Sequence, residues 1–259
     1  MGETVNNLTA ALGLEAREHV ALVGGGGKTR LMFVLAEELR QAKKRVITST
    51  TTKIWHRQAS DSTYVGFVQS HPTWREELSG VLKNHGHGFL GHSLLESGKV
   101  EGVNPALADE LFQDKEVDYL IVEADGSAGH PVKAHAEYEP VIPDSATKVV
   151  AMLGLEALGQ EMNPEIVFRM DLFSKLAQIQ EGERLAASVL SRLFLHPEGL
   201  FKGTPISAKR VALLNKLDLL PEEQGARDLA DLVLREKDSR VDRVVMGSIT
   251  DGMYKIIGR

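Results

Sequence analysis

Short apolar runs bounded by turn residues alternate with helical patterns along the chain. The runs predict buried strands at His19–Val23, Arg45–Thr50, Asp118–Glu123, Lys148–Leu153, Arg210–Asn215 and Arg243–Gly247. Apolar residues at helical spacing between them predict helices at Thr29–Lys43, His71–Lys83, Pro105–Phe112, Met170–Gln178, Glu183–Leu195 and Pro221–Leu234. Strands that alternate with helices favour right-handed crossovers. The pattern therefore predicts an α/β fold with a doubly wound, mostly parallel sheet.

Two stretches depart from this alternation. Residues 88–103, GFLGHSLLESGKVEGV, predict a β-hairpin with its turn near Glu-Ser-Gly-Lys. Residues 155–209 form a mixed, mainly helical segment. Because no linker, low-complexity tract or repeat divides the chain, we expect a single domain over residues 1–259 with the hairpin as an insertion.

Composition narrows the possible classes of protein. With 42% hydrophobic and 25% charged residues, the 259-residue chain has the composition of a soluble globular protein. Its net charge of −6, with scattered Lys and Arg, argues against a nucleic-acid partner. The apolar runs are too short for a membrane helix and the N-terminal region has no signal core, so we expect a cytoplasmic protein. The absence of cysteine excludes disulfides, thiolate metal ligands and persulfide carriers.

A run of glycines, VGGGGKT, follows the first predicted strand and opens a helix. In a phosphate-binding loop the backbone N–H groups of Gly24, Gly25, Gly26 and Gly27 would surround the phosphates. Lys28 would reach the β- and γ-phosphates and the Thr29 hydroxyl would ligate Mg²⁺. The usual G-x-x-x-x-G-K-[ST] pattern has a glycine where Leu22 stands, so a plain glycine-rich turn is the alternative. We expect Lys28 to be exposed.

The motif Asn-Lys-x-Asp, which reads guanine in GTPases, follows another predicted strand as Asn215, Lys216 and Asp218. The Asp218 carboxylate can accept from guanine N1–H and N2–H₂, a pair of donors that adenine lacks. Asn215 can meet the O6/N7 side, and the Lys216 stem can lie along the base. A capped strand–helix turn is the alternative. Ser248, at the end of the last predicted strand, is a weaker candidate for a backbone contact to the base.

Two carboxylates, Glu123 and Asp125, stand at the end of a hydrophobic strand, before Gly126. Acids at this position can hold Mg²⁺ directly or through its waters, or position water. The stretch Glu123–Gly126 fits E-x-x-G, a variant that resembles metallochaperone GTPases. The pattern does not decide which acid has which role, and two solvated acids in a turn are the alternative.

Two further clusters carry weaker signals. Hydroxyls and an ammonium at the end of the second strand could meet a phosphate or a second substrate, or could be an ordinary strand end; they belong to Thr48, Thr50, Thr51, Thr52 and Lys53. The run NHGHGFLGH contains His85, His87 and His92, which are more typical of a solvated turn than of a metal site.

Together, VGGGGKT, TSTTTKI, VEADGSAGHPVKAHAEYEPVIP, HPEGLFKG and LLNKLDLL resemble the YqeC family, from about Val20 to Ser248. The resemblance implies a P-loop NTPase type of fold and, by association, a role in the maturation of selenium-dependent molybdenum hydroxylases. Lys133, Glu139 and Pro140 match the family, so Lys133 could contact an anion and Glu139 could pair with it. His130 and His135 depart from the family's usual Arg and Pro.

These features combine into a functional hypothesis. The chain is expected to be a slow, Mg²⁺-dependent nucleoside triphosphatase that prefers GTP over ATP, with Lys28, Glu123 and Asp125 as catalytic residues. A molybdenum hydroxylase or its cofactor would be the client. Alternatives are a nucleotide-dependent transferase or kinase that acts on a small cofactor, and a nucleotide-gated adaptor without appreciable turnover.

Overall fold

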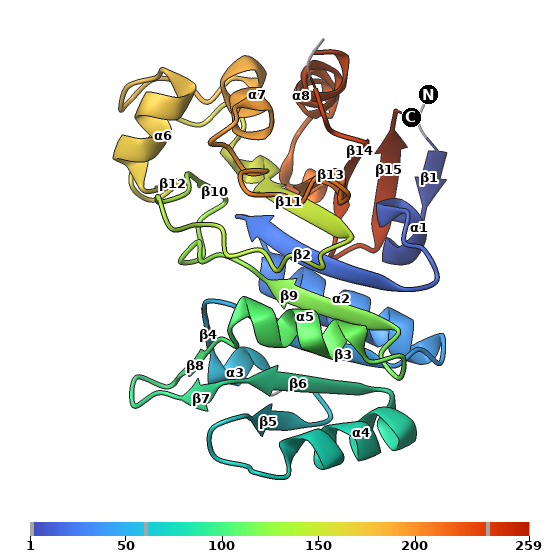
Figure 1. Cartoon of the computed structure of the whole chain (residues 1–259). Coiled ribbons are helices and arrows are strands. Elements are labelled where there is room, and N and C mark those ends of the chain that lie inside the picture. Colours follow the sequence, from blue (N-terminus) through green and yellow to red (C-terminus); the bar gives the residue numbers. More distant parts are fainter. Residues whose placement is uncertain (1–2, 60–61, 237–238, 259) are drawn as a thin grey trace.

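A ten-stranded sheet runs through the computed structural model, which describes residues 3–59, 62–236 and 239–258 (Figure 1). In spatial order its strands are β1 (Glu3–Val5), β15 (Met253–Ile257), β14 (Arg243–Ser248), β13 (Lys209–Asn215), β11 (Lys148–Gly154), β2 (Glu18–Gly24), β9 (Tyr119–Glu123), β3 (Val46–Thr50), β6 (His87–Gly91) and β5 (Val65–Phe67). Every neighbouring pair from β14 to β5 is parallel, whereas β15 and β1 add antiparallel strands at one edge. The structure thus has the mostly parallel α/β sheet that the sequence predicted.

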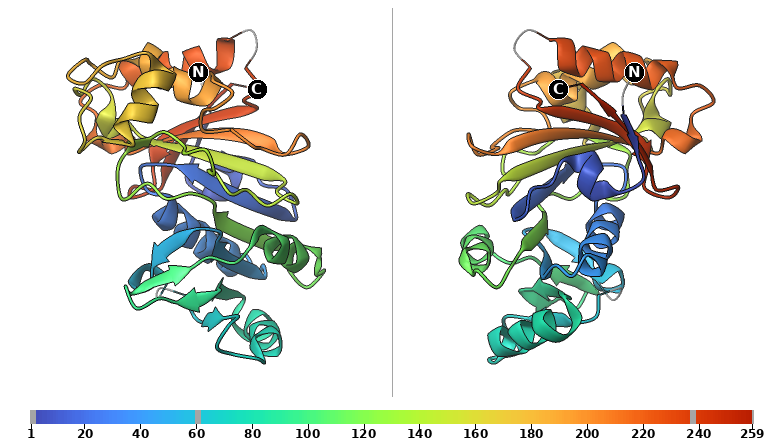
Figure 2. Two further views of the ribbon diagram at one scale, coloured as in Figure 1. Left: turned by 60° about the vertical axis from the view of Figure 1, so that its left-hand side comes forward. Right: turned by 90° about the vertical axis from the view of Figure 1, so that its right-hand side faces the viewer.

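Helices cover both faces of the sheet (Figure 2). Alternate side chains of a strand point to opposite faces, so Ala21 and Val23 of β2 enter one core while Val20 and Leu22 enter the other. One face packs against α1 (Leu8–Leu12) and α2 (Lys28–Gln41). The other packs against α4 (Trp74–His85), α5 (Pro105–Gln113), α6 (Met170–Ala177), α7 (Ala187–Leu195) and α8 (Gln224–Arg235).

Each strand predicted from an apolar run is present within about one residue of its expected bounds. The short strands β1, β5, β6 and β15 were not predicted. The hairpin is shorter than the sequence pattern indicated. Its antiparallel arms are β7 (Ser93–Leu94) and β8 (Lys99–Glu101), and β8 also pairs with β4 (Lys53–Trp55). The stretch before it is instead the buried strand β6, which lies parallel to β3 and β5.

Residues 155–209 form an irregular segment that contains α6 and α7. It packs, together with α8, on the hydrophobic core of one face of the sheet. It includes the 3-10 helix η1 (Leu155–Ala157), and its short strand β12 (Val167–Phe168) pairs with β10 (Val132–Lys133). Helix α7 begins at Ala187 rather than Glu183, because the backbone N–H of Leu185 bonds to the carbonyl of Gln160 instead. The short helix α3 spans His56–Ala59. None of the helices in the described residues is long and apolar enough to cross a membrane.

The strand order places the carboxyl end of β2 where the chain changes direction across the sheet. From β2 the chain passes through α2 to β3 on one side, and β9 then fills the position between them. Later strands, beginning with β11, are added on the other side of β2. Such a switch point opens a crevice at the carboxyl ends of the strands, where α/β proteins bind ligands. The glycine run follows β2 at this point.

Candidate functional site

The four consecutive glycines occupy positions that other residues could not take without strain. Gly24, Gly26 and Gly27 have φ angles of 94°, 80° and 120°, in the left-handed region. Gly25 lies against a second segment, because a Cβ atom there would stand 2.6 Å from the carbonyl oxygen of His130. The run is therefore fixed by backbone geometry and close approach, as a tight strand–helix loop requires.

The amides of this loop divide into two groups. The N–H groups of Gly25 and Gly26 donate to the carbonyls of Met152, at 3.0 Å, and of His130, at 3.1 Å. In the described part of the chain, the amides of Gly27, Lys28 and Thr29 have no such acceptor, and no side chain caps α2. The first N–H groups of a helix carry partial positive charge. An anion would therefore meet the second half of the loop, not the whole run that the sequence suggested.

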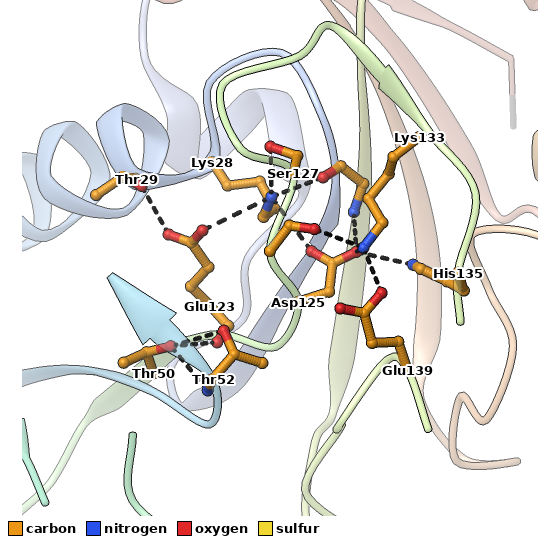
Figure 3. A network of polar contacts seen from close by, with 12 residues as sticks. Lys28, Thr29, Thr50, Thr52, Glu123, Asp125, Ser127, Lys133, His135 and Glu139 are labelled. Carbon is orange, nitrogen blue, oxygen red and sulfur yellow. Dashed lines mark hydrogen bonds and ion pairs between the residues drawn. The ribbon is translucent and has the colours of Figure 1, made fainter. Parts of the chain in front are cut away.

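Lys28 is buried, contrary to the expectation of an exposed loop residue: only 3% of it is exposed. Its ammonium donates to the carbonyl of Gly24, at 2.6 Å, and lies 3.2 Å from Asp125 Oδ1 and 3.6 Å from Glu123 Oε1 (Figure 3). Burial alone would lower the pKa of Lys28, but the two carboxylates outweigh it and raise the pKa. The side chain thus carries a fixed positive charge beneath the loop.

Glu123 joins the loop to the end of β9. Its Oε2 accepts a hydrogen bond of 2.7 Å from the hydroxyl of Thr29, the second residue of α2. Burial raises the pKa of Glu123, although Lys28 and Thr29 oppose the shift. The structure therefore brings together a hydroxyl and a carboxylate, two of the oxygen types that Mg²⁺ prefers.

Asp125 faces the loop from the other side and is fully buried. Its Oδ2 accepts from the backbone N–H of Gly24, at 2.9 Å, and lies 2.8 Å from His135 Nε2 and 3.0 Å from Lys133 Nζ (Figure 3). Burial would raise the pKa of Asp125, but Lys28, His135 and Lys133 together hold it well below its usual range. The carboxylate binds the loop itself.

Lys133 and Glu139 form a buried pair behind Asp125, as the sequence suggested. The Lys133 ammonium donates to Glu139 Oε2 and to the carbonyl of Gly126, each at 2.7 Å. With Asp125 as a third partner, all three protons of the ammonium are engaged, so the expectation that Lys133 contacts an external anion is not supported. Arg169 Nη2 donates to Glu139 Oε1 at 3.0 Å. Burial would raise the pKa of Glu139, but Arg169 and Lys133 outweigh it and lower this pKa.

The structure gives roles to residues that the sequence reasoning left unassigned. His135, treated as a departure from the family pattern, contacts Asp125 through Nε2 and the carbonyl of Gly199 through Nδ1, at 3.1 Å. His130 supplies its backbone carbonyl to Gly26. Arg169 lies 30 residues from Glu139 in the chain, and no sequence motif indicated that the two side chains would pair. The position of both histidines between Asp125 and Glu139 was the only available hint.

The Asn-Lys-x-Asp stretch lies beside the loop. Asn215 Nδ2 donates to the carbonyl of Gly26, at 2.8 Å, and Asn215 Oδ1 accepts from the N–H of Ile249, at 3.1 Å. The amide thus links the loop to the residue that follows β14. This link uses one of the two Nδ2 protons, and the contact to guanine O6 or N7 that the sequence suggested stays a prediction. Lys216 pairs with Glu156 of η1.

Asp218 and Ser248 differ in exposure. Asp218 is exposed within the 3-10 helix η2 (Leu217–Leu219), next to this junction. Ser248 is buried, and its hydroxyl accepts from the N–H of Asp251 at 3.1 Å. An exposed carboxylate can still meet a ligand, whereas the Ser248 side chain serves the turn after β14.

The threonine cluster at the end of β3 is mostly satisfied by the protein. The Thr50 and Thr51 hydroxyls donate to the carbonyls of Glu123, at 2.9 Å, and Val141, at 2.7 Å. Thr48 Oγ1 lies 2.9 Å from His87 Nε2, and Lys53 is exposed on β4. These contacts favour the structural interpretation of the cluster.

The histidine run does not assemble a metal centre. His85 ends α4, whereas His87 is buried in β6. Across the described residues, no group of three or more His, Asp or Glu side chains is placed to hold a metal ion.

A glycine loop between a central strand and a helix, with a buried lysine and a neighbouring strand that ends in acids, defines the P-loop class of nucleotide-binding folds. Comparison with known proteins agrees with the resemblance found in the sequence. The model of the family described as YqeC protein matches residues 20–171. The uncharacterized protein YqeC of Escherichia coli (strain K12) is 35% identical over 251 residues, which cover 94% of this chain and 93% of that protein. The chain belongs to the YqeC family.

Among solved structures, chloroplast FtsY from Physcomitrella patens is similar with a TM-score of 0.45 and 13% identity. The match covers 98% of this chain and 65% of that chain, so this protein spans about two thirds of its length.

Proposed function

We propose that this protein binds a nucleoside triphosphate together with Mg²⁺ at Gly24–Thr29 and hydrolyses it slowly. The observation that carries the proposal is the Lys28 ammonium, buried under a loop whose later amides have no acceptor in the described chain. A buried cation beside free helix N-terminal amides suits the β- and γ-phosphates. Family membership and fold class favour nucleotide binding as well.

Mg²⁺ fits the residues present, and we assign its site to Thr29 and Glu123. Thr29 Oγ1 and Glu123 Oε2 lie 2.7 Å apart at the N-terminus of α2, and both are hard oxygen ligands. Asp125 is different, because Oδ2 is shared among three donors and the residue has no exposed surface. We therefore assign Asp125 to positioning the loop. When bound, Mg²⁺ supplies positive charge to the phosphate oxygens.

The protein's own part in hydrolysis is to position the phosphates and neutralise their charge. The Lys28 ammonium is held by the Gly24 carbonyl, the Ser127 hydroxyl and the two acids. We propose that a phosphate oxygen replaces the long contact to Ser127, 3.3 Å, when the nucleotide binds. Asn215 fixes the middle of the loop by bonding to the carbonyl of Gly26. Because Glu123 and Asp125 are already paired with Lys28, neither is free to activate water, which supports slow intrinsic turnover.

Guanine is the proposed base. Asp218 is an exposed carboxylate in the middle of η2, and Asn215, three residues before it, reaches the phosphate loop. This geometry supports a base that extends from the loop toward Asp218. Recognition then rests mainly on Asp218, because one N–H and the oxygen of the Asn215 amide hold the loop and only the second N–H is left for the base.

We further propose that turnover supports the maturation of a molybdenum hydroxylase or its selenium-containing cofactor. The support is the association of the YqeC family with these enzymes. Because the chain has no cysteine, its part is the supply of energy or of a nucleotide-dependent conformation, not a covalent selenium carrier.

Titration calorimetry with GTP, in the presence and absence of Mg²⁺, tests the assignment of the two acids. Glu123→Gln should abolish the gain in affinity that Mg²⁺ gives and leave Mg²⁺-free binding near wild type. Asp125→Asn should weaken binding under both conditions, because the loop loses its anchor. Glu76→Gln, an exposed acid on α4, is the matched control and should behave as wild type. Absence of triphosphate binding by the wild-type protein would refute the proposal.

A further inference from the structure

A pocket of about 400 Å³ lies at the opposite end of β13 from the glycine loop. Its walls come from the end of α7, the turn that follows it, the first residues of β13 and the segment before β14. They are lined by Phe194, His196, Phe201, Thr204, Arg210 and Arg240. The volume falls within the range of small-molecule sites. Asn215 marks the other end of the same strand, about 17 Å away at the usual rise per residue.

Two buried polar atoms of this pocket lack partners. The Thr204 hydroxyl oxygen and the Arg210 Nε atom have no hydrogen-bond partner in the part of the chain that the structure describes. Buried polar groups in proteins are nearly always hydrogen-bonded, so each unpaired group requires an explanation. Both line the same cavity, and a bound group that accepts hydrogen bonds would satisfy them together.

The charged side chains that line the pocket indicate whether the bound group is an anion or a cation. Burial lowers the pKa of Arg210, and the positive charge of the nearby Arg240 lowers it further. The neighbouring acid, Asp242, already accepts from the backbone N–H of Arg210, at 2.8 Å, and lies 3.7 Å from Lys209 Nζ. The charge of Asp242 opposes the shift in the pKa of Arg210, but neither arginine forms an ion pair with a carboxylate within residues 3–59, 62–236 and 239–258. Two guanidinium groups that line one cavity favour an anion.

The remaining walls are mainly apolar, with His196 and Ser239 as further polar residues. The rings of Phe194 and Phe201 lie 6.3 Å apart and are mostly buried, and Leu195, Pro197 and Val241 complete the lining. A bare inorganic ion would leave these surfaces uncovered. An apolar or aromatic body attached to the anionic group would cover them.

We infer that this pocket binds a small organic anion, a carboxylate or phosphate on an aromatic or apolar body. Arg210 and Arg240 hold the anionic group, the Thr204 hydroxyl donates to it, and the two phenylalanines contact the body. The site is separate from the glycine loop and does not depend on the proposed nucleotide-binding function.

Calorimetric titration with benzoate, phenyl phosphate, benzyl alcohol and inorganic phosphate tests the inference. At least one aromatic anion should bind more tightly than benzyl alcohol, which lacks the charge, and than inorganic phosphate, which lacks the ring. The preferred anion tells a carboxylate site from a phosphate site. Binding of none of the probes, or equal binding of all of them, would overturn the inference.

Variants localise the binding. Arg240→Gln and Thr204→Val should each weaken the preferred anion by about ten-fold. Arg240 is exposed, so its variant should fold even if Arg210→Gln does not. Arg235→Gln is the control, because Arg235 is exposed on α8 and pairs with Asp231 outside the pocket. Unchanged affinity in Arg240→Gln, in a protein with the wild-type circular dichroism spectrum, would also overturn the inference.

Discussion

His135 Nε2 lies 2.8 Å from Asp125 Oδ2, the same oxygen that accepts the backbone N–H of Gly24. Because the carboxylate is ionised and only accepts, the histidine must be the donor. The other ring nitrogen lies 3.1 Å from the carbonyl oxygen of Gly199, which also only accepts, so both contacts are hydrogen bonds when both ring nitrogens carry a proton. In that form the ring links the first glycine of the loop to the turn after α7.

Substitution of His135 should therefore loosen the loop without removing a ligand contact. We expect His135→Leu to lower the free energy of unfolding by about 2 kcal/mol, because Asp125 loses a charged hydrogen bond. Nucleotide affinity should also fall, as the Gly24 amide loses part of its support. Urea denaturation and calorimetry measure the two effects. His71→Leu, an exposed histidine, is the control, and equal behaviour of the two variants would contradict the anchoring role.

Lys28→Met should cost both binding and stability. The substitution removes the cation shared by Asp125 and Glu123: Asp125 keeps Lys133, whereas Glu123 is left buried without a cation, and loss of one partner of a buried pair typically costs about 3 kcal/mol. The double variant Lys28→Met/Asp125→Asn should be less destabilised than the sum of its single variants. Urea denaturation of all three gives this coupling energy. An additive result would mean that the buried pair contributes nothing.

Asp218→Asn tests base recognition. The amide presents one acceptor and one donor, which suits xanthine O2 better than guanine N2–H₂. We expect GTP affinity to fall by about 2 kcal/mol and XTP affinity to rise. Competition among GTP, ATP and XTP on wild type, Asp218→Asn and the exposed control Asp228→Asn measures this preference. Equal affinity of the wild type for GTP and ATP would reject guanine recognition and leave the phosphate loop intact.

The stability of the fold should depend on pH through two buried histidines. Burial lowers the pKa of His19 to about 4, against the opposing charge of Asp109. It lowers the pKa of His87 to about 4 as well, with Glu37 opposing and Arg40 adding to the shift. The unfolded chain takes up both protons near pH 6.5, so the contribution of these two histidines to the free energy of unfolding is constant well above that pH and falls on acidification toward pH 4. Each histidine contributes up to about 3 kcal/mol.

Urea denaturation between pH 5 and 7 measures this dependence. The slope of the free energy of unfolding against pH reports the number of protons taken up on unfolding. We expect His87→Gln to lower this number by about one between pH 5 and 6.5, whereas the exposed control His71→Gln keeps the wild-type slope. A wild-type stability that stays flat through this range would show that the two histidines titrate normally.

Local patterns in the sequence predicted most of the residues of the site. The glycines of the loop were identifiable because a tight turn at a helix N-terminus needs residues without Cβ, and the φ angles of Gly24, Gly26 and Gly27 agree. Thr29 and Glu123 were both expected near Mg²⁺, and the fold places them in contact. The pairing of Lys133 with Glu139, six residues apart, was also within reach of the sequence.

Other features depended on contacts between distant segments. The burial of Lys28 could not be read from its loop position, because it results from Asp125 and Ser127, about a hundred residues away. The role of the Asn215 amide in holding the loop depends on Gly26 and Ile249, which come from opposite parts of the chain. Side chains at such distances meet only after the sheet has formed.

By itself the sequence determined the order of strands and helices, the parallel character of the sheet and the place of the glycine loop, because these follow from local hydrophobic periodicity and turn chemistry. Only the tertiary structure decided the division of labour between the two acids. Glu123 and Asp125 stand two residues apart at the end of one strand, yet one bonds to Thr29 and the other to Gly24 and His135. The physical reason is that a carboxylate's role follows from the donors around it, and those donors come from two segments, residues 24–29 and 133–135, that meet only in the folded chain.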